Sequence, residues 1–405
     1  MHELKTSYGA LAAEAAASAK SLIALRRRLH QYPEVGNQEY RTTALLKREL
    51  QRLGLKIVDG HAATGLWAEL DTGREGPVIA IRTDIDALPV VEETGLPFAS
   101  KIKGAMHACG HDVHMAVLIG VARLLTRHKS DLIGKVKFIC QPAEEIPPGG
   151  ARPLITAGVL ERPKVDVILS LHVDSGLPVG SIGLRDGVNM ASVYDFDLRI
   201  IGRSGHAAMP HRAVDAIAVS AEVISGLQQI VSRMTDPVEP LVISFGAVKG
   251  GLARNVVAGE VIITGTARSL NAAGSKKLPS QIKHTAAQIA KAFGARVEIV
   301  SIADYPPLKA DPRVNRFIAD SFRAVFPRGK IHQIPVVMGG EDFACYLEKI
   351  PGSMFRLGVG NKKIGADKPW HHPAYMIDEN AITVGVATMA AAATNLLHNW
   401  NGGPR

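Results

Sequence analysis

Residues 104–114 of this chain have the sequence GAMHACGHDVH, which gathers three histidines, a cysteine and an aspartate. The stretch opens an apolar run with helical spacing that continues to Leu125. Cys109 and His111 stand two residues apart, so both side chains can point into one space where the chain is extended or turning. A thiolate and a neutral imidazole are ligands that zinc and other late divalent metals prefer. A polar turn in which Asp112 caps the helix is the alternative, but so dense a cluster favours a metal site.

The composition is that of an ordinary globular protein. The 405 residues suffice for two or three domains, and 46% hydrophobic with 21% charged residues indicate no disorder. The formal net charge is +9, but the basic residues are scattered, and with only 5% aromatic residues the stacking platforms of nucleic-acid binders are missing. We therefore expect no nucleic-acid partner, and at most a surface that attracts anionic substrates.

The cysteines and apolar runs bear on the cellular compartment. The three cysteines cannot all pair and show no disulfide-framework spacing: Cys109, Cys140 and Cys345. No secretory signal is recognisable, and the apolar runs near 116–121 and 384–393 are too short or too interrupted to span a bilayer. We expect a cytoplasmic protein without membrane association.

Strands and helices alternate over the first part of the chain. Near-continuous apolar strand candidates occur at residues 66–70, 78–82, 135–140 and 165–171. Helical runs separate them, which indicates an α/β fold with a mixed, largely parallel sheet covered by helices. Polar clusters follow three of these strands: Asp84-Ile85-Asp86, Gln141-Pro142-Ala143-Glu144-Glu145, and His172. Functional groups collect just beyond the carboxyl ends of strands in such sheets, so these clusters are candidates for a site.

The pattern changes near residue 188. Strands are predicted near 193–201, 241–248, 260–268 and 296–302, with helices near 213–232 and 273–293. Their order, strand-helix-strand-strand-helix-strand, is typical of a ferredoxin-like α+β domain. The α/β pattern then resumes to the end of the sequence. We predict a catalytic domain made of residues 1–188 and 306–405, with residues 189–305 as an inserted domain.

Glutamates and histidines elsewhere in the chain could complete a metal site. Glu144 and Glu145 are adjacent, so at an extended strand end they would point to opposite sides, one toward a metal and the other as general base. A surface loop for these acids, and a satisfied buried histidine for His172, are the alternatives. Five candidate ligands result, enough for two metals that share one: Cys109, His111, Glu145, His172 and His371.

Seven motifs, in order and over essentially the whole chain, together resemble one family. They lie at residues 27–36, 82–89, 106–114, 141–145, 205–211, 339–343 and 371–373. The family is that of the metal-dependent amidohydrolases in the aminoacylase and carboxypeptidase-like superfamily, in the branch of hippurate hydrolases and plant auxin-conjugate hydrolases. The resemblance implies hydrolysis of the amide bond of N-acyl amino acids, such as hippurate-like or N-acetyl conjugates, to a carboxylic acid and an amino acid.

The resemblance also implies a role for each candidate residue. Cys109 would bridge two divalent metal ions (Mn, Zn, Co or Ni), completed by His111, Glu145, His172 and His371. Glu144 would be the general base, and Asp86 would orient a ligand histidine. The inserted domain would act as a lid and dimerisation domain, and its His206 would stabilise the oxyanion across a homodimer. The substrate carboxylate would be held by Asn255 and Arg268.

Some assignments stay open. Ile146-Pro147-Pro148 stands where related enzymes usually have glycines, which leaves the substrate preference undecided. His372 competes with His371 as last ligand, and the His-x-Pro spacing selects His371. A surface salt bridge is the alternative role for Arg268. A dipeptidase or carboxypeptidase with the same metals is an alternative function. A non-catalytic binding protein is another, although it should have lost Glu144 or a ligand, and all are present.

Overall fold

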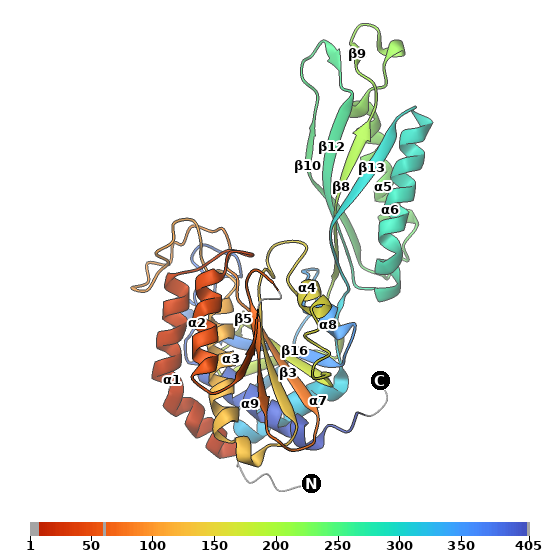
Figure 1. The fold of residues 1–405 in the computed structure, drawn as a ribbon. Coiled ribbons are helices and arrows are strands. Elements are labelled where there is room, and N and C mark those ends of the chain that lie inside the picture. Colours follow the sequence, from red (N-terminus) through yellow and green to blue (C-terminus); the bar gives the residue numbers. More distant parts are fainter. Residues whose placement is uncertain (1–7, 60–61, 403–405) are drawn as a thin grey trace. The chain divides into compact units, whose positions relative to one another are not determined.

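The computed structural model describes residues 8–59 and 62–402, which form two compact units (Figure 1). The first unit contains the chain up to Gly187, Lys309–Pro335 and the chain from Cys345 onward. The second contains Val188–Leu308 and Val336–Ala344. The sequence pattern had assigned this last short stretch to the catalytic domain. The roles of the two units in catalysis and dimerisation stay predictions.

An eight-stranded mixed sheet forms the framework of the first unit, in the order β1-β2-β4-β3-β5-β16-β6-β15. The strands are β1 (Lys56–Val58), β2 (Leu66–Asp71), β3 (Val78–Asp84), β4 (Lys135–Gln141), β5 (Val167–Pro178), β6 (Ser181–Leu184), β15 (Lys330–Gln333) and β16 (Gly352–Gly360). The central strands β4, β3, β5 and β16 run parallel, while β1 and β2 pair antiparallel at one edge. The prediction of a mixed, largely parallel sheet is confirmed.

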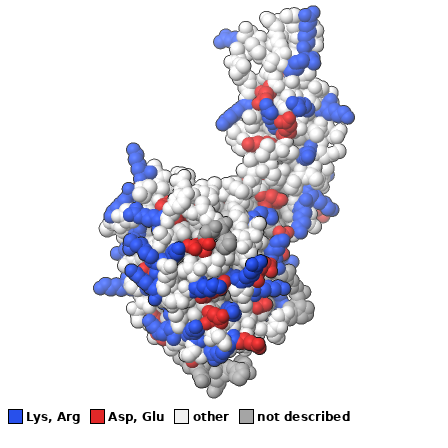
Figure 2. Space-filling view, in the orientation of Figure 1, with Lys and Arg blue, Asp and Glu red and all other residues white. Residues whose placement is uncertain are grey.

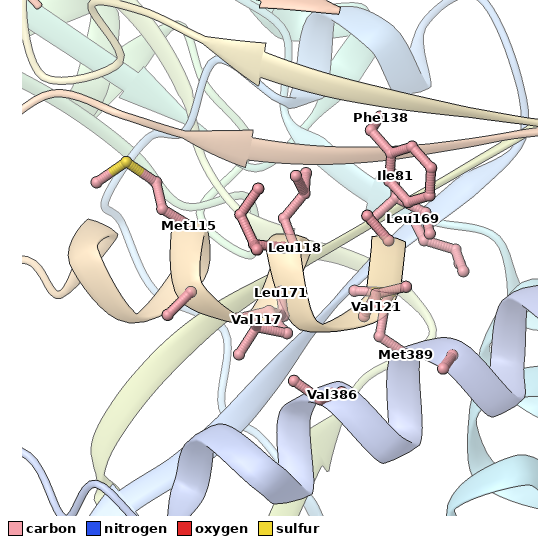
Figure 3. Close-up of a cluster of buried hydrophobic side chains, with 14 of the residues drawn as sticks. Ile81, Met115, Val117, Leu118, Val121, Phe138, Leu169, Leu171, Val386 and Met389 are labelled. Atoms are coloured by element: carbon pink, nitrogen blue, oxygen red, sulfur yellow. The ribbon is translucent and has the colours of Figure 1, made fainter. Parts of the chain in front are cut away.

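Helices from both ends of the chain cover this sheet. They are α1 (Tyr8–Gln31), α2 (Tyr40–Gln51), α3 (His111–Arg127), α4 (Ala151–Thr156), α7 (Pro312–Val325), α8 (Ala344–Leu347) and α9 (Ala381–Asn399). Helices α1, α3 and α9 contact one another, and α3 and α9 also contact the strands. Figure 3 shows α3 between strand residues such as Ile81 and Phe138 and the α9 residues Val386 and Met389. Because α3 is apolar on almost every side, it is buried nearly throughout.

The apolar sequence of α9 is likewise explained by burial in the core. Among the described residues, α9 is the one helix whose length and hydropathy would suit a membrane span, and 78% of that stretch is buried inside the protein. A core helix passes the same test of length and composition, and α9 packs against α1, α3, α7 and the sheet. Its hydrophobicity therefore follows from its place in the core.

The second unit is a four-stranded antiparallel sheet with two helices. Its strands are β8 (Ser192–Ile201), β10 (Leu241–Gly250), β12 (Glu260–Ser269) and β13 (Arg296–Tyr305), in the order β10-β12-β8-β13. The helices are α5 (Ala216–Arg233) and α6 (Ala272–Ala292), capped by the side chains of Asp215 and Asn271. This topology is the predicted ferredoxin-like pattern. A short pair, β9 (Gly205–His206) and β11 (Val256–Val257), adds to it. The chain passes between the units at β7 (Gly187–Met190), at β14 (Leu308–Ala310) and on either side of Val336–Ala344.

The scattered basic residues (Figure 2) and the unpaired cysteines agree with the sequence analysis. Figure 2 shows Lys and Arg spread over the visible face of both units, with Asp and Glu among them on much of it. All three cysteines are buried and free of disulfides. A reducing, cytoplasmic environment and the absence of nucleic-acid and membrane partners stay predictions.

Candidate metal and catalytic site

The turn before α3 brings Cys109 and His111 to the sheet. Between them, Gly110 has a φ of +85°, and a Cβ atom there would lie 2.5 Å from Cγ2 of Val173, so only glycine fits. Sγ of Cys109 lies 3.4 Å from Nε2 of His172 on β5. All three of these ligand side chains are buried. His172 lies within β5, which is longer than predicted, rather than beyond the end of a strand.

His111 is held so that one ring nitrogen faces the cluster. Its Nδ1–H donates to the main-chain oxygen of Asp86 at 2.9 Å, and Nδ1 lies 3.5 Å from the Asp86 carboxylate. Nε2 is buried, has no hydrogen-bond partner among the described residues, and lies 3.7 Å from Oε1 of Glu145. The contacts of Asp86 with Nδ1 are those expected of a residue that orients a ligand histidine.

The two glutamates lie in a turn, which corrects the premise that they end an extended strand. Strand β4 ends at Gln141, and Ala143 has a φ of +53°, in the left-handed region. The backbone N–H of Glu145 donates to Oδ2 of Asp86 at 2.9 Å, and Oε1 of Glu145 lies 3.4 Å from Nε2 of His371. The left-handed residue bends the chain, so both carboxylates face the cluster rather than opposite sides of a strand.

Ligand atoms of all five predicted metal ligands lie close together. Within each of three groups the atoms are no more than 4.8 Å apart: Cys109 with His111 and His172, Cys109 with Glu145 and His371, and His111 with Glu144 and Glu145. Cys109 is the residue shared by the two triads that together hold all five candidate ligands, which fits a bridging ligand. Oε1 of Glu145 and Nε2 of His111 are buried and make no hydrogen bond to the described residues, although Oε1 of Glu145 lies within ion-pair distance of His371 and of His111. Such orphaned polar atoms fit a pair of cations.

The protonation of the metal-free cluster follows from burial and charge. Burial raises the pKa of the Cys109 thiol well above its usual value, and the nearby Glu145 and Glu144 carboxylates add to this. Burial lowers the pKa of His172 well below normal. Burial also opposes the charge on His111, but the Asp84 carboxylate and the hydrogen bond to Asp86 outweigh it and raise the pKa of His111 to about 10. A cation would replace the protons on the cysteine and on this histidine.

A hydrogen-bonded chain that the sequence analysis did not assign supports His172. Nδ1–H of His114 donates to Asp84 at 2.6 Å, and Nε2 of His114 accepts the backbone N–H of Val173 at 3.0 Å. Burial lowers the pKa of His114, which suits the neutral ring that these bonds require. The carbonyl oxygen of Val173 in turn accepts Nδ1–H of His172 at 2.8 Å and Nε1–H of Trp370 at 2.9 Å. The spacing of His111 and His114 on one helix face could have revealed this residue.

The last candidate ligand, His371, lies in a tight turn. His371 has a φ of +65°, and its backbone N–H donates to the main-chain oxygen of Ala108 at 2.9 Å. His372, the competing ligand, uses Nδ1 to accept the N–H of Ala374 at 3.0 Å. The contact of His371 with Glu145 also raises the pKa of this histidine. The geometry thus favours the residue that the His-x-Pro spacing selected.

In the second unit, His206 and Asn255 lie together. Val256 pairs with His206, and the main-chain oxygen of Asn255 accepts the N–H of Ala207 at 3.1 Å. Nδ1 of the exposed His206 accepts the N–H of Ala208 at 3.1 Å. In the neutral ring the hydrogen therefore sits on Nε2, which makes that atom a hydrogen-bond donor.

Arg268, on β12, forms an ion pair with Asp195. Its Nη1 donates to Oδ1 of Asp195 on the neighbouring strand β8 at 3.0 Å, with both side chains about a quarter exposed. This is the salt bridge that the alternative interpretation expects. Binding of a substrate carboxylate by Arg268 stays a prediction.

Comparison with known proteins agrees with this geometry. Residues 80–395 match the sequence pattern of peptidase family M20/M25/M40. The chain belongs to this family. An N-acetylcysteine deacetylase of Bacillus subtilis is 41% identical over 378 residues, which cover 93% of this chain and 97% of that protein. A thermostable carboxypeptidase of Saccharolobus solfataricus is 34% identical over 92% of this chain and 94% of its own. The crystal structure of a dinuclear metal-binding M20 peptidase from Bacillus subtilis superposes with a TM-score of 0.79 at 38% identity, covering 95% and 99% of the two chains.

Proposed function

We propose that this M20-family protein hydrolyses the amide bond of N-acyl amino acids, such as N-acetyl or hippurate-like conjugates, to a carboxylic acid and an amino acid. The observation that carries the proposal is the membership of Cys109 in two ligand triads beside Glu144. The 41% identity to an N-acetylcysteine deacetylase over nearly the full length of both chains supports this substrate class.

In the proposed mechanism, each residue of the site has its own role. Two divalent cations (Mn, Zn, Co or Ni) would be held by Cys109, His111, Glu145, His172 and His371, and would polarise the amide carbonyl and acidify a water molecule. Glu144 takes a proton from the water as its oxygen attacks the carbonyl carbon. It then delivers a proton to the amine as the C–N bond breaks. Nε2–H of His206 donates to the oxyanion, and the substrate carboxylate binds Asn255 and Arg268.

The two adjacent glutamates provide the sharpest test. Glu144→Gln should retain both metal ions and lose about 10²- to 10⁴-fold in kcat, because only the base is removed. Glu145→Gln should lose metal as well, since Glu145 belongs to the triad with Cys109 and His371. Elemental analysis of both variants, beside the rate with N-acetyl amino acids, decides the assignment. Metal loss in the first variant but not in the second would reverse the two roles.

A carboxypeptidase or dipeptidase with the same metals is the second candidate function. The observation that favours it is the 34% identity to a thermostable carboxypeptidase. A panel of N-acetyl, N-benzoyl and indole-acetyl amino acids beside dipeptides, with each candidate metal added, separates the two. A non-catalytic binding role would be supported only if every member of the panel stayed intact.

We further propose a cytoplasmic homodimer in which each site borrows His206 from the other subunit. The exposed Nε2 donor of His206 supports a role toward a substrate. His206→Ala and Glu144→Ala homodimers should both be nearly inactive. Mixed after mild dissociation, they should recover up to about a quarter of wild-type activity, because statistical heterodimers contain one intact site. Heterodimers that form without any recovery would place His206 in its own chain's site or outside catalysis.

A further inference from the structure

Glu39 is a buried carboxylate that the mechanism above does not use. It immediately precedes α2, and none of its surface is exposed. Oε1 accepts the backbone N–H of Ala143 at 2.8 Å, and Oε2 accepts the hydroxyl of Thr64 at 2.6 Å. Both partners are themselves buried. A carboxylate withdrawn from water in this way requires such bonds, but nothing about α2 requires the carboxylate to be there.

Helix capping does not explain Glu39. The residue occupies the N-cap position of α2, yet its side chain makes no capping hydrogen bond. The first amides of the helix are met by another side chain, since Glu34 accepts the N–H of Arg41 at 3.1 Å and that of Thr42 at 2.7 Å. The Glu39 carboxylate is therefore free to serve the turn at Ala143.

The turn at Ala143 requires contacts from other parts of the chain to keep its conformation. Ala143 has a φ of +53°, a conformation that is unfavourable for any residue with a Cβ atom and persists only where its surroundings enforce it. The next residue but one, Glu145, is held by its N–H bond to Asp86. Glu144 lies between these two anchored amides. Gly36 closes the turn from outside, because a Cβ atom there would lie 2.8 Å from Ile146 and 3.2 Å from Ala143.

We propose that Glu39 is a positioning residue for Glu144: by accepting the Ala143 N–H, it holds the left-handed turn that aims the base at the reacting centre. The inference rests on the proposed function, because it assumes that Glu144 is the general base. Loss of this bond should lower kcat more than it alters substrate affinity or metal content. The Glu145 anchor to Asp86 does not depend on Glu39, and misplacement of a catalytic group by about 1 Å costs on the order of 100-fold in rate.

Two conservative variants test the bond. Glu39→Gln keeps an oxygen acceptor at the same reach and should keep kcat within about threefold of wild type. Glu39→Asp keeps the charge but withdraws the oxygen by roughly one C–C bond, so kcat should fall about 100-fold while KM and bound metal stay near wild type. Steady-state kinetics with an N-acetyl amino acid and elemental analysis are the two measurements. Equal kcat values in the two variants would overturn the proposal.

Two further variants separate positioning from general stability. Thr64→Val removes the other partner of Glu39 and leaves the Ala143 bond, so it should destabilise the same region with kcat nearly unchanged. Ala143→Gly removes the penalty of the left-handed conformation, and in the Glu39→Asp background it should restore kcat at least fivefold. This double variant also replaces Glu39→Asp if that protein does not fold.

The remaining outcomes are equally decisive. A loss of kcat in Thr64→Val as large as that in Glu39→Asp, or no recovery on adding Ala143→Gly, would mean that Glu39 acts only through the stability of the fold. An inactive, metal-loaded wild-type protein would contradict the proposed function itself. Active wild type with equally active Glu39→Asp would contradict the role of Glu39 alone.

Discussion

The hydrogen bonds that link Asp84, His114 and Val173 predict that His114, a residue outside the five candidate ligands, affects metal affinity. His114→Asn retains an amide near the position of Nδ1, so it can still reach Asp84, but it is too short to accept the Val173 N–H. That N–H, now accepted at 3.0 Å, would be left buried without an acceptor. The Val173 carbonyl that orients His172 would lose its fixed position.

The magnitude follows from these bonds. A buried donor left without its acceptor costs about 1–3 kcal/mol. Loss of an outer-shell hydrogen bond to a metal ligand typically weakens metal affinity about 10- to 100-fold, or about 1.4–2.7 kcal/mol. We therefore expect His114→Asn to bind metal at least tenfold more weakly. His114→Gln, which reaches Val173 but not Asp84, should bind nearly as wild type although its unfolding free energy falls by about 2 kcal/mol.

Both His114 variants and the wild type are prepared free of metal. Competition with a chromophoric chelator measures their affinity for added metal, and urea unfolding measures their stability. In His114→Gln, Asp84 keeps its ion pair with Arg82 at 2.8 Å, so the buried carboxylate retains one charged partner. This makes the two variants a matched pair, since both disturb the same buried chain at opposite ends. Metal affinity that tracks overall stability, rather than the bond to Val173, would refute the reasoning.

Three other predictions concern the metals, the core and the buried lysine of β4. Dialysis against a chelator should abolish hydrolysis, and Mn²⁺, Zn²⁺, Co²⁺ or Ni²⁺ should restore it; full activity in metal-free protein would contradict this. Gly120→Ala should destabilise by about 1–3 kcal/mol in urea, because its Cβ would lie 2.5 Å from Val386. Burial lowers the pKa of Lys137 to about 8 from 10.5, so the unfolded state binds more protons between these values. Stability should therefore rise with pH there, by up to about 3 kcal/mol, and Lys137→Met should abolish the rise.

Features of the fold and the site that depend on local spacing or periodicity were predictable from the sequence. Cys109 and His111 lie two residues apart around a glycine, and β3 and β4 are largely apolar strands, so the cluster and the sheet follow from spacing and periodicity. The ferredoxin-like order of the second unit is equally visible in its alternating strands and amphipathic helices. Each of these features depends on residues close together in the sequence.

The geometry of the glutamates was not predictable in this way. Adjacent residues on an extended chain point apart, yet Glu144 and Glu145 both lie within reach of His111. The difference arises at Ala143, whose left-handed conformation has no local signal, because alanine prefers other regions of backbone space. The residue that favours this conformation, Glu39, stands far ahead in the sequence and would be taken for a helix cap.

The supporting residues of the site share a common physical pattern. Asp84, Asp86 and Glu39 are fully buried carboxylates, and each accepts hydrogen bonds from groups beside the candidate ligands or the base. A buried carboxylate is costly unless it accepts hydrogen bonds, so each of these acids favours one position of the neighbouring ring or amide that donates to it. The same requirement makes the acids useful, because a ligand set that two cations share tolerates little displacement. The burial of these acids therefore stiffens the site at the points where a cation or a proton has to be received.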